Sequence, residues 1–185
     1  MTVPKIVKTD RLISHRANIT GSDPKLENNP KQIIDIITEY PRLDVEIDVR
    51  YIDDNWYLGH DEPQYKVTLS WLANLYSRLF IHAKDSHTLF KLISIDKSIH
   101  QNNLKRFHQR KPEYFVHDSD KFTFTSNRKY LWHYPGDTPL TNRSIAVMPE
   151  RVENWQGIEA CYAICTDYVL DYSQKYNILL KPIYK

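Results

Sequence analysis

Residues 43–52, LDVEIDVRYI, place an acidic side chain at every second position of an apolar run. The β-branched residues between the acids predict a β-strand, because apolar and polar residues alternate with a period of two. Asp44, Glu46 and Asp48 therefore share one face of that strand. Like charges along a buried face cost free energy unless cations or a functional demand offset them. The fold must bring this face to cations or to a ligand.

Short apolar runs alternate with amphipathic stretches in the first half of the chain, an order typical of βα units. In the second half the connections between apolar runs are short and poorly helical. Residues 56–61 predict a hairpin extension after the second strand. The expected strands are residues 11–17, 43–52, 79–85, 114–120, 130–136, 144–150 and 162–168, and the expected helices are residues 30–40, 69–78 and 87–95.

This order of elements predicts an α/β fold of the parallel-barrel type. A complete eightfold barrel needs about 250 residues, whereas this chain has 185. We therefore expect one domain over residues 1–185, folded as a reduced or incomplete TIM-type (β/α) barrel with few helices in its second half. An incomplete barrel has an exposed sheet edge, and a homo-oligomer that buries this edge is one arrangement that the sequence allows.

Composition and charge exclude several classes of protein. A net charge of +2 gives no overall field for nucleic acid, so we expect no nucleic-acid partner. No apolar stretch approaches the roughly 18 residues of a transmembrane helix, and the N-terminus lacks the apolar core of a secretion signal. Cys161 and Cys165 predict buried thiols rather than a disulfide or a metal pair. The expected location is the cytoplasm.

Ionisable residues follow nearly every expected strand. Parallel barrels build their sites at the carboxyl ends of several strands at once, so we expect these side chains to meet at a common site. They are His15, Arg16, Glu46, Asp48, His82, Lys84, His117, Asp118, Glu150 and Asp167.

The residue types at these strand ends suit chemistry on a phosphate. His15 and His60 could act as general base and general acid about a phosphorus atom. Glu46 and Asp48 offer oxygen ligands to a hard divalent cation such as Mg²⁺ or Ca²⁺. Two basic side chains could supply positive charge to the phosphate, one as a bidentate fork and one as a point charge. They are Arg16 and Lys84.

Several short stretches, taken in order, match a known set of motifs. They are HR at 15–16, EN at 27–28, VEIDV at 45–49, GHD at 59–61, a strand ending in Lys84 and CTDY at 165–168. The chain thereby resembles the glycerophosphodiester phosphodiesterases of the phospholipase C-like phosphodiesterase superfamily of barrels. The likeness is strong over residues 12–85 and thinner afterwards, and the later segments resemble a short divergent branch.

The resemblance implies roles for particular residues. His15 and His60 occupy the positions of the two catalytic histidines, Glu46 and Asp48 those of metal ligands, and Arg16 that of a phosphate contact. In the family mechanism, a hydroxyl of the substrate attacks phosphorus while one histidine takes its proton and the other protonates the leaving oxygen. Water then opens the cyclic phosphate. The residues expected to support the site are Glu27, Asp61, His82, His117, Glu150 and Asp167.

One position departs from the family pattern. The family has a metal-binding glutamate two residues before the lysine, where this chain has His82. Imidazole suits Mn²⁺ or Zn²⁺ better than Mg²⁺ or Ca²⁺. Three outcomes are open: His82 binds a softer metal, the metal is lost, or a nearby acid replaces the missing ligand. We rank the last slightly ahead, with Asp118 or Asp120 as that acid.

The sequence thus predicts a metal-dependent phosphodiesterase that hydrolyses a glycerophosphodiester or a related alcohol-phosphate diester, a small substrate. Trp132 or Tyr134 could line a pocket for its organic headgroup. One alternative is a catalytically inactive member that binds a phosphorylated glycan or lipid headgroup, suggested by His82 and the shortened second half. A second alternative is a lyase that stops at the cyclic product.

Overall fold

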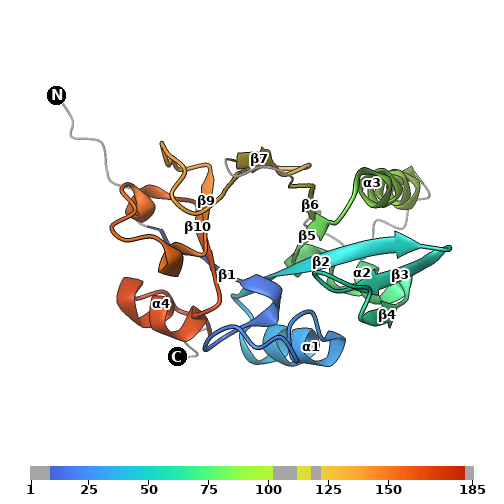
Figure 1. The fold of residues 1–185 in the computed structure, drawn as a ribbon, viewed down its shortest axis with the longest axis horizontal. Helices are drawn as coiled ribbons and strands as arrows, with labels where there is room; N and C mark the ends of the chain where they lie inside the picture. The colour runs from blue at the N-terminus through green and yellow to red at the C-terminus, as the bar shows by residue number, and fades with distance from the viewer. Residues whose placement is uncertain (1–8, 102–111, 118–121, 182–185) are drawn as a thin grey trace.

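The computed structural model of the chain describes residues 9–101, 112–117 and 122–181. Their strands form one curled sheet with few helices outside it (Figure 1). The strands are β1 (Leu12–Ser14), β2 (Asp44–Ile52), β3 (Asn55–Leu58), β4 (Tyr65–Val67), β5 (Leu79–Ala83), β6 (Glu113–Phe115), β7 (Phe122–Phe124), β8 (Leu131–His133), β9 (Ser144–Val147) and β10 (Ala163–Thr166). The α-helices are α1 (Pro30–Glu39), α2 (Leu69–Leu75), α3 (Ser86–Gln101) and α4 (Val169–Tyr176), and the 3₁₀ turns are η1 (His15–Ala17), η2 (Tyr76–Arg78), η3 (Pro149–Arg151) and η4 (Ile158–Ala160).

The central part of the sheet is parallel, in the order β6-β5-β2-β1-β10-β9-β8. Strand β2 is long enough to have three neighbours: β1 and β5 are parallel to it, and β3 pairs antiparallel with its last residues. Strands β3 and β4 extend this hairpin, and β7 is antiparallel to β8. Parallel pairing brings the carboxyl ends of the central strands to one edge, as the sequence predicted.

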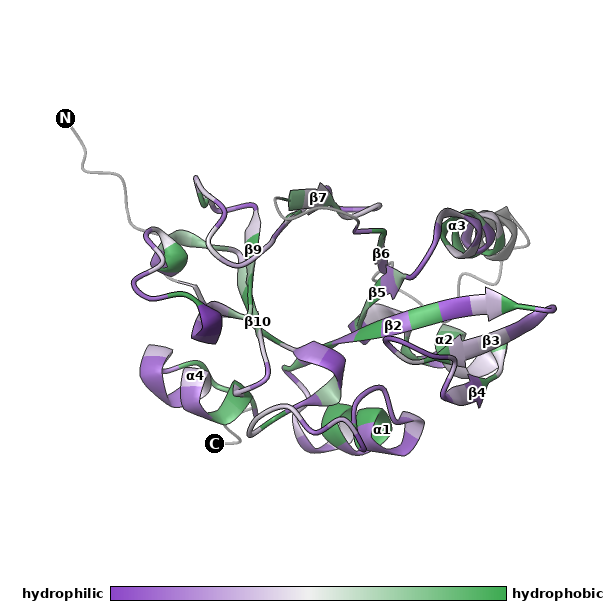
Figure 2. Cartoon of the chain, in the orientation of Figure 1, coloured by the Kyte–Doolittle hydropathy of each residue, from purple (hydrophilic) through white to green (hydrophobic). Residues whose placement is uncertain are grey.

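The two faces of each central strand have different surroundings. Val45, Ile47 and Val49 of β2 are fully buried in the larger core cluster, which lies between the sheet and its helices. A smaller cluster fills the inside of the curled sheet, as expected for a narrow barrel-like sheet. It contains Ile13, Phe80, Phe115, Tyr130, Trp132, Ile145, Val147, Met148, Ala163 and Cys165. Figure 2 shows hydrophobic residues along the strands and hydrophilic ones over much of α4 and the loops.

Local signals fix several helix ends. Asn29 caps α1 by accepting hydrogen bonds from the amides of Lys31 and Gln32, and Pro30 occupies the first turn. Thr68 caps α2 by accepting from the amide of Trp71. Among the described residues, no helix combines the length and apolar character needed to cross a bilayer. Both cysteines are buried thiols without a disulfide, as predicted.

The described fold confirms a mixed α/β chain with a curled, incomplete barrel-like sheet and few helices. Each expected helix and strand has a counterpart in the described residues, with shifted ends. The expected strand at 114–120 is the short β6, and residues 118–121 lie outside the described residues. Strands β4 and β7 and helix α4 were not predicted. Strands β4 and β7 have three residues each, and no longer apolar run marks them in the sequence.

Candidate active site

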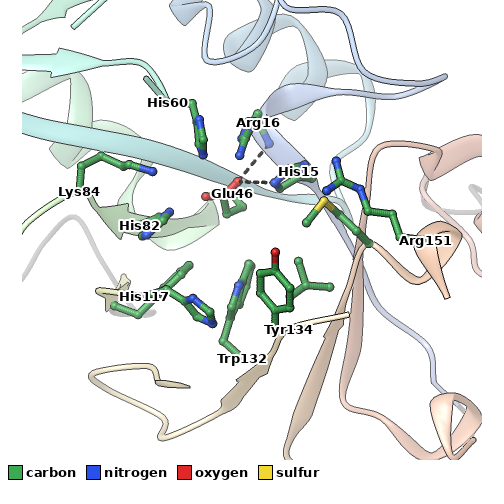
Figure 3. Close-up of a pocket in the computed structure, with 13 residues that line it drawn as sticks. His15, Arg16, Glu46, His60, His82, Lys84, His117, Trp132, Tyr134 and Arg151 are labelled. Carbon is green, nitrogen blue, oxygen red and sulfur yellow. Dashed lines mark hydrogen bonds and ion pairs between the residues drawn. The ribbon is translucent and has the colours of Figure 1, made fainter. Parts of the chain in front are cut away.

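A cavity of about 400 Å³ lies at the carboxyl ends of the central strands (Figure 3). Hydrophobic side chains of the inner core cluster form part of its wall, and ionisable side chains from several strand ends form the rest. The lining residues are His15, Arg16, Glu46, His60, His82, Lys84, Phe115, His117, Trp132, Tyr134, Val147, Met148 and Arg151. The strand ends therefore converge as predicted, although the residues are far apart in the chain.

The chain turns sharply after β1. Arg16 and Ala17 have positive φ angles of 52° and 66°, which non-glycine residues rarely adopt. This conformation aims the Arg16 amide at Glu46, whose Oε2 accepts its hydrogen bond at 3.1 Å. The Arg16 carbonyl accepts a hydrogen bond from the Asn28 amide at 2.9 Å. Backbone strain of this kind persists where the surroundings hold it, and here it places His15 and Arg16 at the cavity.

His15 is held between two carboxylates. Its Nδ1 lies 2.7 Å from Asp167 Oδ1, and its Nε2 lies 4.0 Å from Glu46 Oε2. Asn18 donates to the same Asp167 oxygen at 2.8 Å and so fixes that carboxylate. Burial alone would lower the pKa of His15, but the hydrogen bond to Asp167 and the charge of Glu46 outweigh burial and raise it. The geometry favours a protonated imidazole.

His60 reaches the same cavity from the loop after β3 (Figure 3). Its Nδ1 lies 2.7 Å from Asp61 Oδ1, so Asp61 orients the ring. Arg50 donates to the carbonyls of His60 and Asp61 at 2.7 and 3.0 Å and ties the loop to β2. Burial and the positive charge of Arg16 lower the pKa of His60. The two imidazoles therefore have pKa values displaced in opposite directions, a pattern typical of acid–base pairs.

Asp48 is a fully buried carboxylate contacted by four side chains. Its Oδ1 lies 2.9 Å from His82 Nδ1 and 3.3 Å from Lys84 Nζ. Its Oδ2 lies 3.2 Å from Arg16 Nε and accepts from Asn28 Nδ2 at 3.0 Å. Burial would raise the pKa of Asp48, but the hydrogen bond to His82 and these positive charges hold it far below its ordinary value. Asp48 is therefore ionised.

Glu46 has fewer partners than Asp48. Besides the Arg16 amide, its neighbours include the rings of His15 and His82 and the charge of Asp48. Burial and the nearby Asp48 carboxylate raise its pKa. An additional positive charge next to Glu46 would favour its ionised form.

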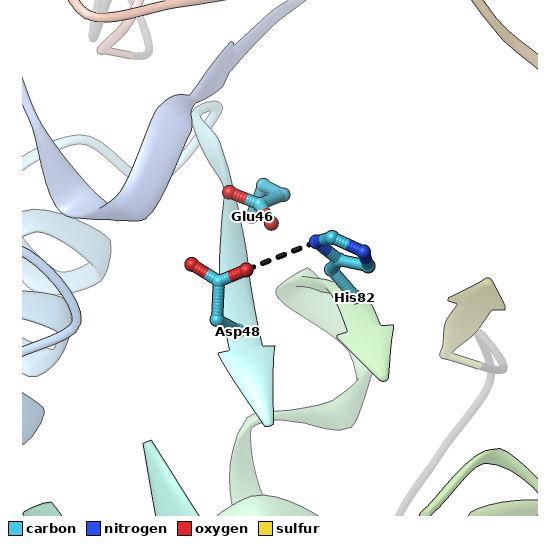
Figure 4. Close-up of side chains that lie close together, drawn as sticks. All are labelled: Glu46, Asp48 and His82. Atoms are coloured by element: carbon cyan, nitrogen blue, oxygen red, sulfur yellow. Dashed lines mark hydrogen bonds and ion pairs between the residues drawn. The ribbon is translucent and has the colours of Figure 1, made fainter. Parts of the chain in front are cut away.

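Glu46, Asp48 and His82 form a cluster in which one ligand atom from each lies within 4.8 Å of the others (Figure 4). His82 is in hydrogen-bond contact with Asp48 through Nδ1, and its ring stacks on Phe115 at 5.0 Å. A neutral imidazole nitrogen can instead present its lone pair to a cation. Two carboxylates and one imidazole on the neighbouring strands β2 and β5 are a set of groups that could hold a divalent cation. Asp118 and Asp120, the predicted replacement ligands, lie outside the described residues.

The third acid of β2 does not belong to this cluster. Asp44 Oδ1 lies 3.2 Å from Arg78 Nε, at the opposite end of the strand from the cavity. The acidic face of β2 is therefore matched by arginine and lysine side chains at Asp44 and Asp48, whereas Glu46 between them has no such partner at ion-pair distance among the described residues. Asp44 balances Arg78 in the scaffold, whereas Asp48 balances Arg16 and Lys84 at the cavity.

The predicted supporting residues fall into two groups. His82 and His117 line the cavity directly. Glu27, Glu150 and Asp167 do not line the cavity but hold residues near it, and the exposed Asp61 orients His60 from the solvent side. Glu27 accepts from Arg16 at 3.2 Å, and Glu150 accepts from the Thr166 hydroxyl and the Asp167 amide at 2.9 and 3.0 Å.

Sequence reasoning missed three polar residues of the site. Asn18 donates to both Glu27 and Asp167, Asn28 holds Asp48 through its side chain, and Arg151 lines the cavity. Asn28 stands in the EN motif beside Glu27, so its position was marked although its role was not. Arg151 follows a predicted strand end by one residue and resembles any surface arginine in the sequence. The structure places Arg151 at the end of the turn η3, where its side chain lines the cavity.

No family model, curated protein or solved structure matches the chain. The geometry of the cavity and the sequence motifs therefore carry the functional proposal.

Proposed function

We propose that this protein is a metal-dependent phosphodiesterase that hydrolyses a glycerophosphodiester or a related alcohol-phosphate diester. The observation that carries the proposal is the convergence of His15 and His60 with Arg16 and Lys84 in one cavity. Two imidazoles supply an acid and a base, and two cations suit the charge of a phosphoryl group. The incomplete TIM-type barrel that we propose for the fold has its sites at the same end of the strands.

The proposed reaction begins with the diester phosphate beside Arg16 and Lys84. A hydroxyl of the substrate attacks phosphorus, and one imidazole takes its proton while the other protonates the departing alkoxide oxygen. The displaced pKa values favour neutral His60 as the base and protonated His15 as the acid. Water then attacks the cyclic phosphate, and the two imidazoles exchange roles. Asp61 and Asp167 hold the two rings in orientation.

A divalent cation held by Glu46, Asp48 and His82 would stabilise the negative charge that develops on the phosphoryl oxygens. We propose Mg²⁺, Ca²⁺ or Mn²⁺ for this role, and the imidazole ligand favours Mn²⁺ or Zn²⁺ among the divalent metals. Asp118 stays a proposed further ligand.

Hydrolysis of glycerophosphodiesters in the presence of Mg²⁺, Ca²⁺ or Mn²⁺ tests the proposal. We expect His15→Gln and His60→Gln to lower kcat/KM by roughly 10²- to 10⁴-fold, the usual contribution of one acid or base. The matched control is His87→Gln, because His87 is exposed on α3 and lies outside the cavity. An equal loss of kcat/KM in the control would contradict the proposal. So would full activity of both cavity variants with unchanged thermal unfolding.

A second candidate is a binding protein without turnover. Asp48 already has protein donors for both of its carboxylate oxygens, so its charge is balanced without a metal ion. Tight calorimetric binding of a phosphodiester, with no product under any of the metals, would favour this candidate. Measurable turnover would exclude it.

A further inference from the structure

Arg151 is exposed and lines the cavity on a different wall from the proposed phosphate-binding pair, Arg16 and Lys84. Arg16 and Lys84 follow β1 and β5, whereas Arg151 ends η3 after β9. Along the sheet, β2, β1 and β10 separate β5 from β9. Figure 3 shows Lys84 and Arg151 on opposite sides of the cavity, with Tyr134 on the Arg151 side. A third cationic side chain is thus available beyond the proposed position of the reacting phosphate.

The turn that carries Arg151 is held in a strained conformation. Met148 has a φ of 46°, in the left-handed region that residues other than glycine seldom adopt. Its amide donates to the Cys165 carbonyl at 2.7 Å, and its carbonyl accepts from the Arg151 amide at 3.0 Å. Pro149 fixes the first position of the turn. An observed outlier of this kind is a reason to ask what the turn positions.

The neighbouring acid is directed away from Arg151. Glu150 uses both carboxylate oxygens on β10 and the residue after it, through the Thr166 hydroxyl and the Asp167 amide. This contact locks η3 onto β10. Arg151 therefore stands on a rigid turn whose own carboxylate is already occupied.

The remaining acids of the site are also occupied. Asp48 contacts Arg16 and Lys84, and Asp167 contacts His15. Glu46 accepts from the Arg16 amide and lies 4.0 Å from His15. In the part of the chain that the structure describes, no carboxylate lies within ion-pair distance of the Arg151 guanidinium. Its positive charge faces the cavity without a protein counter-charge.

We propose that Arg151 binds a second anionic group of the substrate. The preferred diester would then carry a carboxylate or a phosphate monoester on its alcohol part, in addition to the reacting phosphate. The planar guanidinium suits both groups, because each offers two oxygens to its paired N–H donors. This inference rests on the proposed function and specifies its substrate class.

Calorimetry with matched analogues tests this inference. The probes are methylphosphonate monoesters of glyceramide, glycerate and glycerol phosphate, which carry the single charge of a diester but lack its second, leaving alkoxide. We expect the wild-type protein to bind at least one of the two anionic probes about tenfold more tightly than the amide, the size of a charged hydrogen bond. The anionic probe that binds more tightly shows whether Arg151 binds a carboxylate or a phosphate.

The preference for the anionic probes over the amide probe should depend on Arg151 and on no exposed arginine outside the cavity. Arg151→Gln should bring the ratio of affinities close to one while affinity for the amide probe stays within about twofold, which also shows that the variant is folded. Arg42→Gln is the matched control, because Arg42 is exposed and outside the cavity. A wild-type ratio near one, or an unchanged ratio in Arg151→Gln, would overturn the proposal.

Turnover of glycerophosphodiesters, measured in parallel, separates this inference from the proposed function. A preference for anionic probes without turnover would support the Arg151 subsite and contradict hydrolysis. Turnover without the preference would support hydrolysis and overturn the subsite. If the protein shows no preference for the anionic probes and no turnover, both proposals are overturned.

Discussion

Single residues at this site work mainly by controlling charge. Asp48 is ionised inside the protein because His82, Lys84 and Arg16 surround it. A buried carboxylate without such partners would be costly, so removing one partner leaves an uncompensated charge. Asp48 thereby couples the proposed phosphate-binding residues to the proposed metal cluster.

The pH dependence of catalysis should reflect His60. Burial and Arg16 lower its pKa below the ordinary value of 6.5, so the neutral base persists to lower pH. We expect kcat/KM to fall only as the pH drops through this lowered pKa, which places the acid limb below pH 6.5. Arg16→Gln removes one cause of the lowered pKa and should move the acid limb to higher pH, although overall activity also falls. A limb at or above pH 6.5 in the wild-type protein would contradict the assignment.

At the scale of elements, short turns after the strands direct the site residues. The turn η1 presents His15 and Arg16, the β3–β4 loop presents His60, and η3 presents Arg151. The sequence predicted the strand ends, because His, Asp and Glu interrupt apolar runs there. It also named Glu46 and Asp48, rather than Asp44, as the acids of the site, although the strand period alone does not separate them. Asp44 and Asp48 share a strand face, yet only the tertiary position of Arg78 separates their roles.

The loop that carries His60 depends on Gly59. Gly59 has a φ of 146°, and a Cβ there would lie 2.0 Å from the Glu62 carbonyl oxygen. We expect Gly59→Ala to displace the loop and lower kcat/KM by at least about tenfold, because small displacements of catalytic groups are costly. Gly136→Ala is the control for the positive φ alone, since its Cβ would meet no atom within 4 Å. Equal activity of Gly59→Ala and the wild-type protein would show that the loop does not position His60.

At the scale of the whole molecule, the curled sheet joins distant parts of the chain at one cavity. His15 and Asp167 are in contact although 152 positions separate them. The motifs near the two ends of the chain are therefore brought together only when the sheet is complete. The sequence could predict this convergence from parallel topology, but not the neighbours that β4, β7 and Arg151 acquire, because those depend on packing rather than on local pattern.

Binding of a cation should stabilise the folded molecule. A ligand at 100 times its Kd adds about 2.7 kcal/mol to the free energy of unfolding. For a chain of this size, Tm should then rise by roughly 5–10 °C. We expect Mn²⁺ to raise the Tm of the wild-type protein and of the exposed control Glu153→Gln, but not that of Glu46→Gln, which loses a ligand of the cluster. An equal rise in all three proteins would place the metal elsewhere.

Phosphorus NMR of the purified protein with a glycerophosphodiester and a divalent metal tests the central claim most directly. The convergence of His15 and His60 on one cavity predicts that the diester resonance decays into that of an open monoester, and that His60→Gln stops the decay. A diester resonance that stays constant with every metal, or one that decays equally fast in His60→Gln, would contradict the account.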